Sequence, residues 1–295
     1  MAQRFVLTER DTKLLVDLYT HRYLSFIQLW RMHFVSKQTT FRRLRQLGTA
    51  GLINGFRLPN ISHSIYRVSA KGLQVVAETL GVERSDLKWN EPQSKPKDYY
   101  FMKHFLEIND FRIRLRKDCA FEKVTLKGFI PDYVGERSDR GGMVKYVRDV
   151  ICDKAAERQE LSHTPDGVFA LEKNGKVALF FLEIDRGTEV VSNKDKGVLK
   201  AIRFYAQYLM DGKYQRYAKD FDVDSFKGFR ALFVTTSEER RQNIRDAAAT
   251  LGVPQKALQF LWIATGFRVL IMPGPFGYIW HSADPTDETK YLIVK

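Results

Sequence analysis

Cysteine, histidine and long apolar runs are all scarce in this chain of 295 residues. It has two cysteines and six histidines, with no Cys-x-x-Cys pair, so neither a disulfide framework nor a structural zinc site is expected. The longest uninterrupted apolar run covers residues 177–182, far short of the roughly 20 residues that a membrane-spanning helix needs. Residues 1–11 carry charges where a signal peptide would be apolar. We therefore expect a cytoplasmic protein without membrane insertion.

Acidic residues are also in the minority. Lysine and arginine number 48 against 35 aspartates and glutamates, which gives a formal net charge of +13. Such a balance favours polyanionic partners, and nucleic acid before an anionic membrane. The phosphate-binding pattern GxxxxGK[ST] is absent, so an ATP-driven motor is not supported. His163 and His281 stand alone in the sequence, so the histidine cluster that a tyrosine-based relaxase would need is missing too.

Residues 1–82 have the pattern of a winged helix-turn-helix. Apolar residues at helical spacing predict three helices, then strands over residues 54–58 and 64–68, and a closing helix over residues 70–80. A serine or threonine stands at the N-cap position of each helix: Thr8, Ser25, Ser36 and Ser69. Three helices, a two-stranded wing and a closing helix are the order of that DNA-binding motif.

The third helix, from Ser36 to about Gly48, carries the DNA hypothesis. Phe41, Leu44 and Leu47 predict its buried face. Arginine and lysine read guanine edges and phosphates, glutamine reads adenine, and threonine serves either. The residues that we expect to contact DNA are Lys37, Gln38, Thr39, Arg42, Arg43, Arg45 and Gln46 on this helix, with Arg57 and Arg67 on the wing. A solvated basic face, or a protein-docking module, is the alternative interpretation.

A second domain is expected over residues 100–295, after a polar linker over residues 83–99 that holds two prolines. Its helices are predicted over residues 101–117, 193–210 and 238–251, and its strands over residues 121–130, 164–171, 177–184, 230–235, 258–263 and 268–272. A charged insertion near residues 131–162 contains a candidate short helix near residues 144–159. Helix, antiparallel hairpin, helix, strand and helix are the order of the PD-(D/E)xK nuclease core. The predicted fold class is therefore mixed α+β or α/β, a winged helix-turn-helix followed by a restriction-endonuclease-like mixed-sheet domain.

Three carboxylates are the candidate catalytic and metal-binding residues. Asp166 lies at the start of one strand of the hairpin, while Glu183 and Asp185 project from the same face of its partner strand, two residues apart. Carboxylates gathered in this way can hold Mg²⁺, which activates water against a phosphodiester. The usual lysine two residues after the glutamate is replaced here by Asp185. Substitutes for that lysine could come from the next helix: Lys194, Lys196 or Lys200. Exposed acids at strand ends are the alternative interpretation.

Residues 164–171 and the string FFLEIDRGTE over residues 180–189 resemble the plasmid replication-relaxation family. That family couples a winged helix to a domain with a PDG strand, an FFLExDRGTE strand and a helix bearing lysine and tyrosine, which Lys200 and Tyr205 match here. The resemblance implies a role on mobile DNA, in plasmid replication, relaxosome assembly or conjugative transfer. Arg186 of the DRGTE string is a candidate phosphate contact, and Glu189 a further candidate for the metal shell; an ion pair that holds the strand end is the alternative for both.

Three functions stay open at this point. The first is a double-stranded DNA-binding protein of a plasmid or mobile element, with an inactive or weakly active nuclease-like domain and with relaxase or replication proteins as partners. The second is a magnesium-dependent endonuclease targeted by its winged helix. The third is a transcriptional regulator whose C-terminal domain dimerises or senses a ligand. Paired half-sites on DNA would favour a homodimer.

Overall fold

Two compact units divide the chain, one over residues Met1–Asp110 and one over Phe111–Lys295. The computed structural model describes residues 5–87, 98–138, 141–152, 160–188, 191, 193 and 196–294. Helices and strands alternate in both units, so the mixed α+β class expected from the sequence is confirmed. Among the residues so described, no helix combines the length and the apolar character needed to cross a bilayer.

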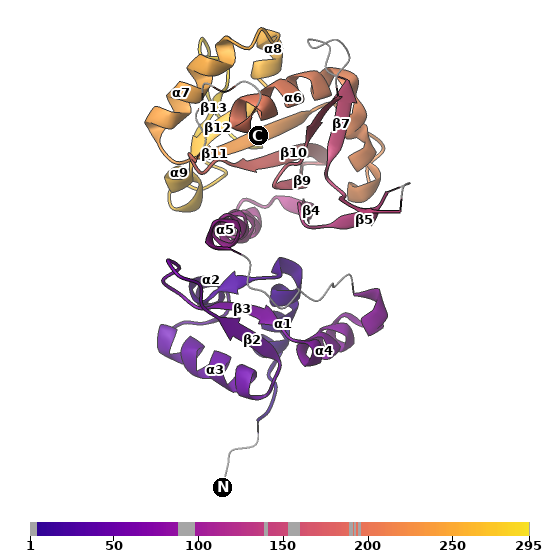
Figure 1. The fold of residues 1–295 in the computed structure, drawn as a ribbon, viewed down its shortest axis with the longest axis vertical. Helices are drawn as coiled ribbons and strands as arrows, with labels where there is room; N and C mark the ends of the chain where they lie inside the picture. The colour runs from indigo at the N-terminus through magenta and orange to yellow at the C-terminus, as the bar shows by residue number, and fades with distance from the viewer. Residues whose placement is uncertain are drawn as a thin grey trace. The chain divides into compact units, whose positions relative to one another are not determined.

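Up to Asp86, the described part of the first unit combines four α-helices with a small antiparallel sheet. The helices are α1 (Glu9–His21), α2 (Phe26–His33), α3 (Lys37–Thr49) and α4 (Ala70–Leu80), followed by the short 3₁₀ helix η1 (Arg84–Asp86). The sheet has the order β1-β3-β2, with β1 (Leu24–Ser25), β3 (Ile65–Val68) and β2 (Ile53–Phe56). Each expected helix and strand of this unit is present, with ends shifted by one or two residues (Figure 1).

Local hydrogen bonds at the helix ends explain why these helices could be predicted from the sequence. Ser25 Oγ accepts from the backbone N–H of Gln28 at 3.2 Å, and the Gln28 side chain returns to the Ser25 N–H at 2.9 Å. Ser36 Oγ accepts from the Thr39 N–H at the start of α3, and Ser69 Oγ accepts from the Gly72 N–H at the start of α4. Such caps satisfy amide groups that a helix leaves unpaired at its start, typically stabilising it by about 1 kcal/mol.

The buried face of α3 differs from the expected one. Thr40, Leu44 and Leu47 are buried, whereas the side chain of Phe41 is 61% exposed. Positions 40 and 41 both fall at helical spacing from Leu44, so periodicity alone could not choose between them. The Thr40 hydroxyl donates to the Ser36 carbonyl at 2.7 Å, which lets a polar residue take the inner position. The prediction that Phe41 belongs to the core is therefore wrong.

Arg43 fastens α3 to the start of α1. Its Nε donates to Asp11 Oδ1 at 2.9 Å, and its Nη2 donates to Asp11 Oδ2 and to the Val6 carbonyl. The side chain of Asp11 is fully buried and that of Arg43 is 15% exposed. Asp11 also accepts from the N–H and the hydroxyl of Thr8 at 2.7 and 2.6 Å. A buried carboxylate of this kind depends on its cation, because an unpaired buried charge is costly.

Helix α5 (Tyr99–Phe121) contains the division between the units. Up to Asp110 it belongs to the first unit, where the amide of Asn109 donates to the carbonyls of His21 at 3.1 Å and Tyr23 at 2.8 Å. From Phe111 onward it belongs to the second unit, where the Phe111 ring packs 5.8 Å from that of Phe169. Of the expected linker over residues 83–99, residues 88–97 lie outside the described residues.

A seven-stranded mixed sheet forms the centre of the second unit. Its order is β14-β13-β12-β11-β10-β9-β4, with β10, β11 and β12 parallel and the remaining pairs antiparallel. The strands are β4 (Thr125–Pro131), β9 (Gly167–Lys173), β10 (Lys176–Ile184), β11 (Phe229–Thr235), β12 (Leu261–Thr265), β13 (Trp280–Ser282) and β14 (Lys290–Tyr291). The Asn174-Gly175 turn joins β9 to β10, and both residues have positive φ, as the sequence predicted.

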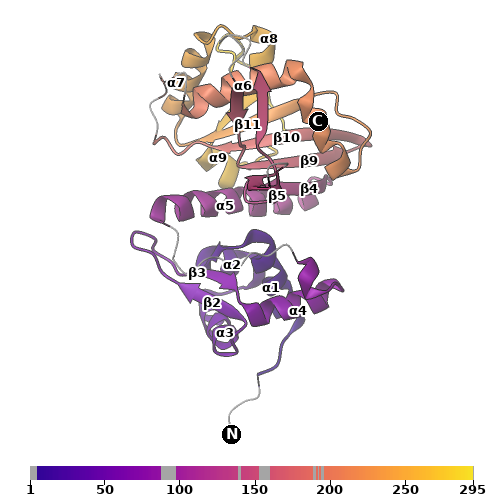
Figure 2. The same cartoon turned by 45° about the vertical axis from the view of Figure 1, so that its right-hand side comes forward.

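Helices cover both faces of this sheet. Figure 2 shows α6 (Gly197–Asp211) lying over one face, with the C-terminal half of α5 on the other side. Tyr205 and Tyr208 of α6 pack against Phe181 and Phe229 of the sheet, and α7 (Glu238–Ala249) adds Ile244 to this core. The remaining short helices of the described chain are η2 (Lys213–Tyr217), η3 (Lys219–Phe221), α8 (Gln255–Leu258) and α9 (Gly266–Leu270).

Two segments of the second unit differ from their predicted form. The insertion forms short antiparallel pairs, β5 (Gly135–Arg137) with β6 (Met143–Lys145) and β7 (Asp149–Cys152) with β8 (Glu160–His163). The helix expected near residues 144–159 is thus wrong for its first half, and residues 153–159 lie outside the described residues. The strand expected over residues 268–272 is also wrong, because helix α9 occupies that place. Short apolar runs do not distinguish strand from helix by periodicity.

The Arg43–Asp11 contact predicts a pH-dependent loss of stability. Burial raises the pKa of Asp11, but the hydrogen bonds from Arg43 and Thr8 outweigh it and hold that pKa below its usual value. In Arg43→Met the buried carboxylate loses its cation, so the free energy of unfolding at pH 7 should fall by about 3 kcal/mol or more. The wild-type contribution is present above the unfolded pKa of about 3.9 and is lost as pH falls through the folded value.

Without Arg43, burial is less opposed and raises the pKa of Asp11 in the variant. The variant then recovers stability as Asp11 takes up a proton, so the difference between wild type and Arg43→Met should shrink between pH 7 and pH 4. Urea unfolding at several pH values measures it. Arg42→Met is the matched control, because Arg42 is the exposed neighbour on the same helix and should change stability by less than about 0.5 kcal/mol. Equal losses in the two variants would contradict an anchoring role for Arg43.

Candidate functional site

The exposed face of α3 is cationic and contains one aromatic ring. Lys37, Gln38, Phe41, Arg42 and Arg45 are all exposed. Neither Arg42 nor Arg45 forms an ion pair with any residue that the structure describes. Guanidinium groups of this kind can reach base edges or phosphates without first leaving a protein partner.

The other predicted contacts on α3 have partners within the protein. Lys37 Nζ lies 4.9 Å from the centre of the Trp30 ring, and the hydroxyls of Thr39 and Ser36 are 2.8 Å apart. Gln46 Oε1 accepts from Arg43 Nη1 at 2.9 Å, and Arg43 itself is held by Asp11. Lys37 and Gln46 are thus exposed and also contact the protein, whereas Thr39 and Arg43 are half-buried and help to fix the helix in place.

The hairpin β2–β3 presents two more of the predicted cations. Arg57 is exposed beyond the end of β2 and donates from Nε to Ser64 Oγ at 3.3 Å. Arg67 is half-buried within β3, opposite Asn54. The turn between the strands contains Asn60 with φ 65°. Both arginines belong to the same unit as α3, so they extend the positive charge of that unit beyond one helix.

The three predicted carboxylates meet at the carboxyl end of β10. Asp166 is placed there by backbone pairing, since its N–H donates to the Leu182 carbonyl at 2.9 Å. Its Oδ2 accepts from the Ile184 N–H at 2.7 Å. Glu183 and Asp185 flank that amide in the sequence. The three acids therefore lie at or beside the end of β10, and the sequence did not reveal what they contact.

Glu183 is bound by two neighbouring side chains. Its Oε1 lies 2.7 Å from His163 Nε2 and accepts from the Tyr205 hydroxyl at 2.5 Å. Burial raises the pKa of Glu183, and the nearby His163 only partly offsets that shift. Sequence reasoning treated His163 as isolated, because β8 and β10 meet only in the tertiary structure. Its place two residues before the Pro165-Asp166-Gly167 motif was the one available signal.

Asp185 forms a different set of contacts. Arg240 of α7 donates to it from Nε at 2.6 Å and from Nη2 at 2.8 Å, and the Thr235 hydroxyl donates at 2.7 Å. Burial alone would raise the pKa of Asp185, but these hydrogen bonds and the charge of Arg240 hold it below its usual value. Arg240 is thus a cation in direct contact with the predicted site, and no signal in the sequence indicated it. It occupies both oxygens of Asp185.

These contacts do not suit a magnesium site. Mg²⁺ requires carboxylate oxygens in near-octahedral geometry, whereas Asp185 is engaged by Arg240 and Glu183 by His163 and Tyr205. Within the described residues, no group of three or more His, Cys, Asp or Glu side chains could hold a metal ion. Arg186 and Lys200 are half-buried and Lys196 is exposed. Glu189 and Lys194 lie outside the described residues.

The family model named replication-relaxation matches residues 15–223 of the chain. This span runs from α1 to just beyond η3. It covers α3, Tyr205 and the carboxyl cluster, which is the group of Asp166, Glu183 and Asp185 at the end of β10. The chain belongs to the replication-relaxation family. Membership in it points to a role in the replication of a plasmid or other mobile element. No match was found among curated proteins.

In this replication-relaxation protein the matched span stops before β11 and α7. Thr235 and Arg240, which hold Asp185, therefore come from the part of the chain beyond the family match. Glu183, His163 and Tyr205 all lie within it. The family span therefore includes every residue of the Glu183 contacts, but only one partner in the contacts of Asp185 with Thr235 and Arg240.

Tyr205→Phe tests how Glu183 is held. The variant removes one donor from a buried carboxylate, so the free energy of unfolding at pH 7 should fall by about 1–3 kcal/mol. Since burial raises the pKa of Glu183, the cost of ionising it appears as pH rises from the unfolded value of about 4.3 through the folded one. The loss should therefore be largest at neutral pH and shrink on acidification.

Urea unfolding at pH 7 and at pH 4 gives both values. Tyr278→Phe, which removes a hydroxyl from a ring that is 66% exposed in the same unit, serves as the control and should leave stability unchanged. A loss that is the same at both pH values would show that the Tyr205 hydroxyl does not stabilise a charged Glu183.

Proposed function

We propose that this protein binds double-stranded DNA through a winged helix-turn-helix in its first unit and acts in the replication or mobilisation of a plasmid or other mobile element. The observation that carries the proposal is the exposed face of α3, where Arg42 and Arg45 stand beside Gln38 and Phe41. A helix with this chemistry matches what the major groove requires.

The order of elements supports α3 as the recognition helix. It follows α2 after three residues, the two helices pack together, and Leu29 of α2 and Leu44 and Leu47 of α3 are buried. The hairpin β2–β3 follows directly and is the counterpart of a wing, with Arg57 near its tip. Asp11 and Arg43 fix the orientation of α3, so that its exposed side chains are presented from a rigid element.

Phe41 gives the proposed interface an apolar contact. Exposure of a phenylalanine in the middle of a cationic helix face is costly in water, since its burial is worth about 2 kcal/mol. On duplex DNA the ring can pack against the C5-methyl group of thymine, which lies in the major groove. Phe41 therefore joins the predicted contacts, in place of Arg43.

The second unit is proposed to have a PD-(D/E)xK-like core that binds without efficient cleavage. Apart from strands β4 to β8 and the short helices η2 and η3, its element order is α5, the β9–β10 hairpin, α6, β11 and α7, which is the order expected of the nuclease core. Asp185 stands where the usual lysine would be, and Arg240 neutralises it. These contacts support a binding or assembly role. Relaxase or replication proteins, and a second copy of the chain on paired half-sites, are the partners that we propose.

Replacing Arg42 and Arg45 together by alanine should reduce specific duplex binding at least tenfold, because each arginine–base contact is worth about 1–3 kcal/mol. The duplex would be one enriched by the wild-type protein from a random pool, and binding would be followed by fluorescence anisotropy. Lys219→Ala with Lys256→Ala removes the same charge from exposed sites of the second unit and should bind normally. If the two double variants bind alike, α3 is not the recognition helix.

Supercoiled plasmid incubated with Mg²⁺, with Mn²⁺ or with EDTA tests the second unit. We expect retarded bands without cleavage in all three, since Asp185 and Glu183 are held by protein donors. Asp166→Ala/Glu183→Ala should retard the plasmid as the wild type does. Metal-dependent nicking that disappears in this double variant would instead make the protein an endonuclease.

A further inference from the structure

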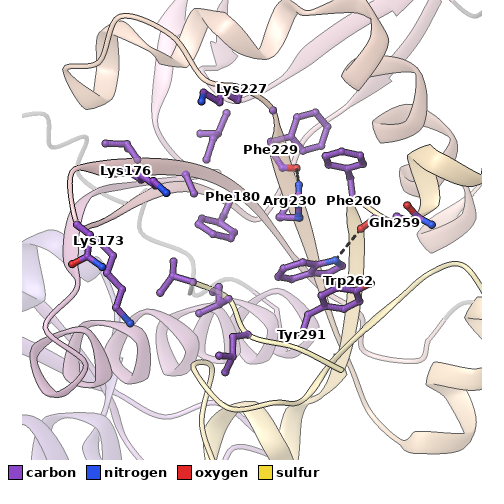
Figure 3. A pocket seen from close by; sticks show the side chains of 18 residues that line it. Lys173, Lys176, Phe180, Lys227, Phe229, Arg230, Gln259, Phe260, Trp262 and Tyr291 are labelled. Atoms are coloured by element: carbon purple, nitrogen blue, oxygen red, sulfur yellow. Dashed lines mark hydrogen bonds between the residues drawn. The ribbon is translucent and has the colours of Figure 1, made fainter. Parts of the chain in front are cut away.

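A cavity of about 690 Å³ opens at the amino end of the parallel strands, at the opposite end of β10 from the carboxyl cluster. It lies wholly within the second unit, between the β9–β10 turn, the start of β11, the start of β12 and the segment after β14. Figure 3 shows Lys173 and Lys176 on one side of it and the rings of Phe260, Trp262 and Tyr291 on the other. Cavities of this size accommodate ligands as large as a nucleotide.

The charge of the cavity is entirely positive. Its lining includes Lys173, Lys176, Lys227 and Arg230, and no aspartate or glutamate among the described residues. Lys173 and Lys176 flank the Asn174-Gly175 turn, and Lys176 and Lys227 are exposed. Such a rim of exposed cations without acids attracts a ligand that carries more than one phosphate.

The aromatic side is built around Arg230. Its guanidinium lies 4.4 Å from the centre of the Phe260 ring and 5.0 Å from that of Trp262. Tyr291 stacks on Trp262 with ring centres 5.0 Å apart and planes 15° from parallel. Phe260 and Tyr291 are half-buried, so part of each ring is open to a ligand. Rings and guanidinium planes of this kind are the surfaces on which unpaired bases stack.

Arg230 is not satisfied by its protein neighbours. Nη1 donates to the Phe229 carbonyl at 3.0 Å, but the buried Nε has no hydrogen-bond partner among the described atoms. Burial lowers the pKa of this guanidinium, which reflects a charge held largely away from water. An anionic group in the cavity would supply the missing counter-charge.

We propose that this cavity is a binding site for single-stranded DNA, in which bases stack on Phe260 and Tyr291 while the lysines and Arg230 hold the phosphates. Duplex DNA does not suit it, because paired bases cannot reach rings at the bottom of a cavity. The site is separate from α3, and only the choice of DNA rather than RNA rests on the proposed function. A protein that melts or mobilises a plasmid produces such strands.

The test uses the full-length protein carrying Arg42→Ala and Arg45→Ala, so that duplex binding by α3 does not contribute. A fluorescent oligothymidylate of about 12 nucleotides, within the site sizes of single-strand-binding folds, is followed by anisotropy. Tyr291→Leu should weaken binding about fivefold or more, the effect of one lost base stack. Tyr291→Phe keeps the ring and should bind as the parent does, which separates stacking from loss of folding.

The lysines are tested by the salt dependence. Lys173→Ala with Lys176→Ala should lower the slope of log Kd against log salt by about 1.4, since each single-strand phosphate contact contributes about 0.7. Lys219→Ala with Lys256→Ala carries the same charge change outside the cavity and should leave the slope unchanged. If the two lysine pairs change the salt slope equally, or if the two Tyr291 variants weaken binding equally, the proposed site is wrong.

Competitors identify the ligand class. Unlabelled oligothymidylate should displace the probe at concentrations where thymidine monophosphate and polyglutamate do not. Displacement by the free nucleotide at the same nucleotide concentration would reduce the cavity to a mononucleotide site, and displacement by polyglutamate would assign it to an acidic peptide. We also measure duplex binding by the wild type and by the cavity variants with Arg42 and Arg45 intact. Failure of the single-strand site is then distinguishable from failure of the proposed duplex binding.

Discussion

Burial of strand β10 on both faces is the constraint on which the second unit depends. Leu179 and Phe181 turn towards the core shared with α6, and Phe180 and Leu182 turn to the opposite face, each no more than 1% exposed. A strand enclosed in this way cannot present polar groups along its length. Its chemistry is therefore found at its ends, with the carboxyl cluster after Leu182 and the cationic cavity beside Lys176.

Contacts within the protein decide which of several charged side chains remain available to bind a ligand. Arg42, Arg43 and Arg45 are close in sequence, yet Arg43 is fixed by a buried Asp11 while its two neighbours are exposed. Two of the carboxylates differ in the same way, since Glu183 contacts His163 and Tyr205, whereas Asp185 contacts Arg240. An ion pair inside the protein costs desolvation but fixes a geometry. In the first unit that geometry holds α3, and in the second it joins α6 and α7 to the end of β10.

The replication-relaxation family span contains the helix face on α3 and the Glu183 contacts, but it ends before Arg240 and before most of the cationic cavity. The chain thus combines a family-wide part with structure contributed by its last quarter. Strands β11 to β14 complete the sheet and provide the aromatic wall of the cavity. The same strands bring Thr235 to Asp185. Residues that follow the family span therefore contribute side chains to both the cavity at one end of β10 and the carboxyl cluster at the other.

The sequence by itself determined the elements whose causes are local. Caps at Ser25, Ser36 and Ser69, the Asn174-Gly175 turn and the apolar run of β10 each act within a few residues, so helices α1 to α4 and the β9–β10 hairpin were predictable. Tertiary structure alone decided the rest. Whether residue 40 or 41 faces the core, whether residues 268–272 are strand or helix, and whether Asp185 meets a metal or Arg240 depend on neighbours distant in the chain. Periodicity carries no information about those neighbours, because it records which side chains share a face and not what that face meets.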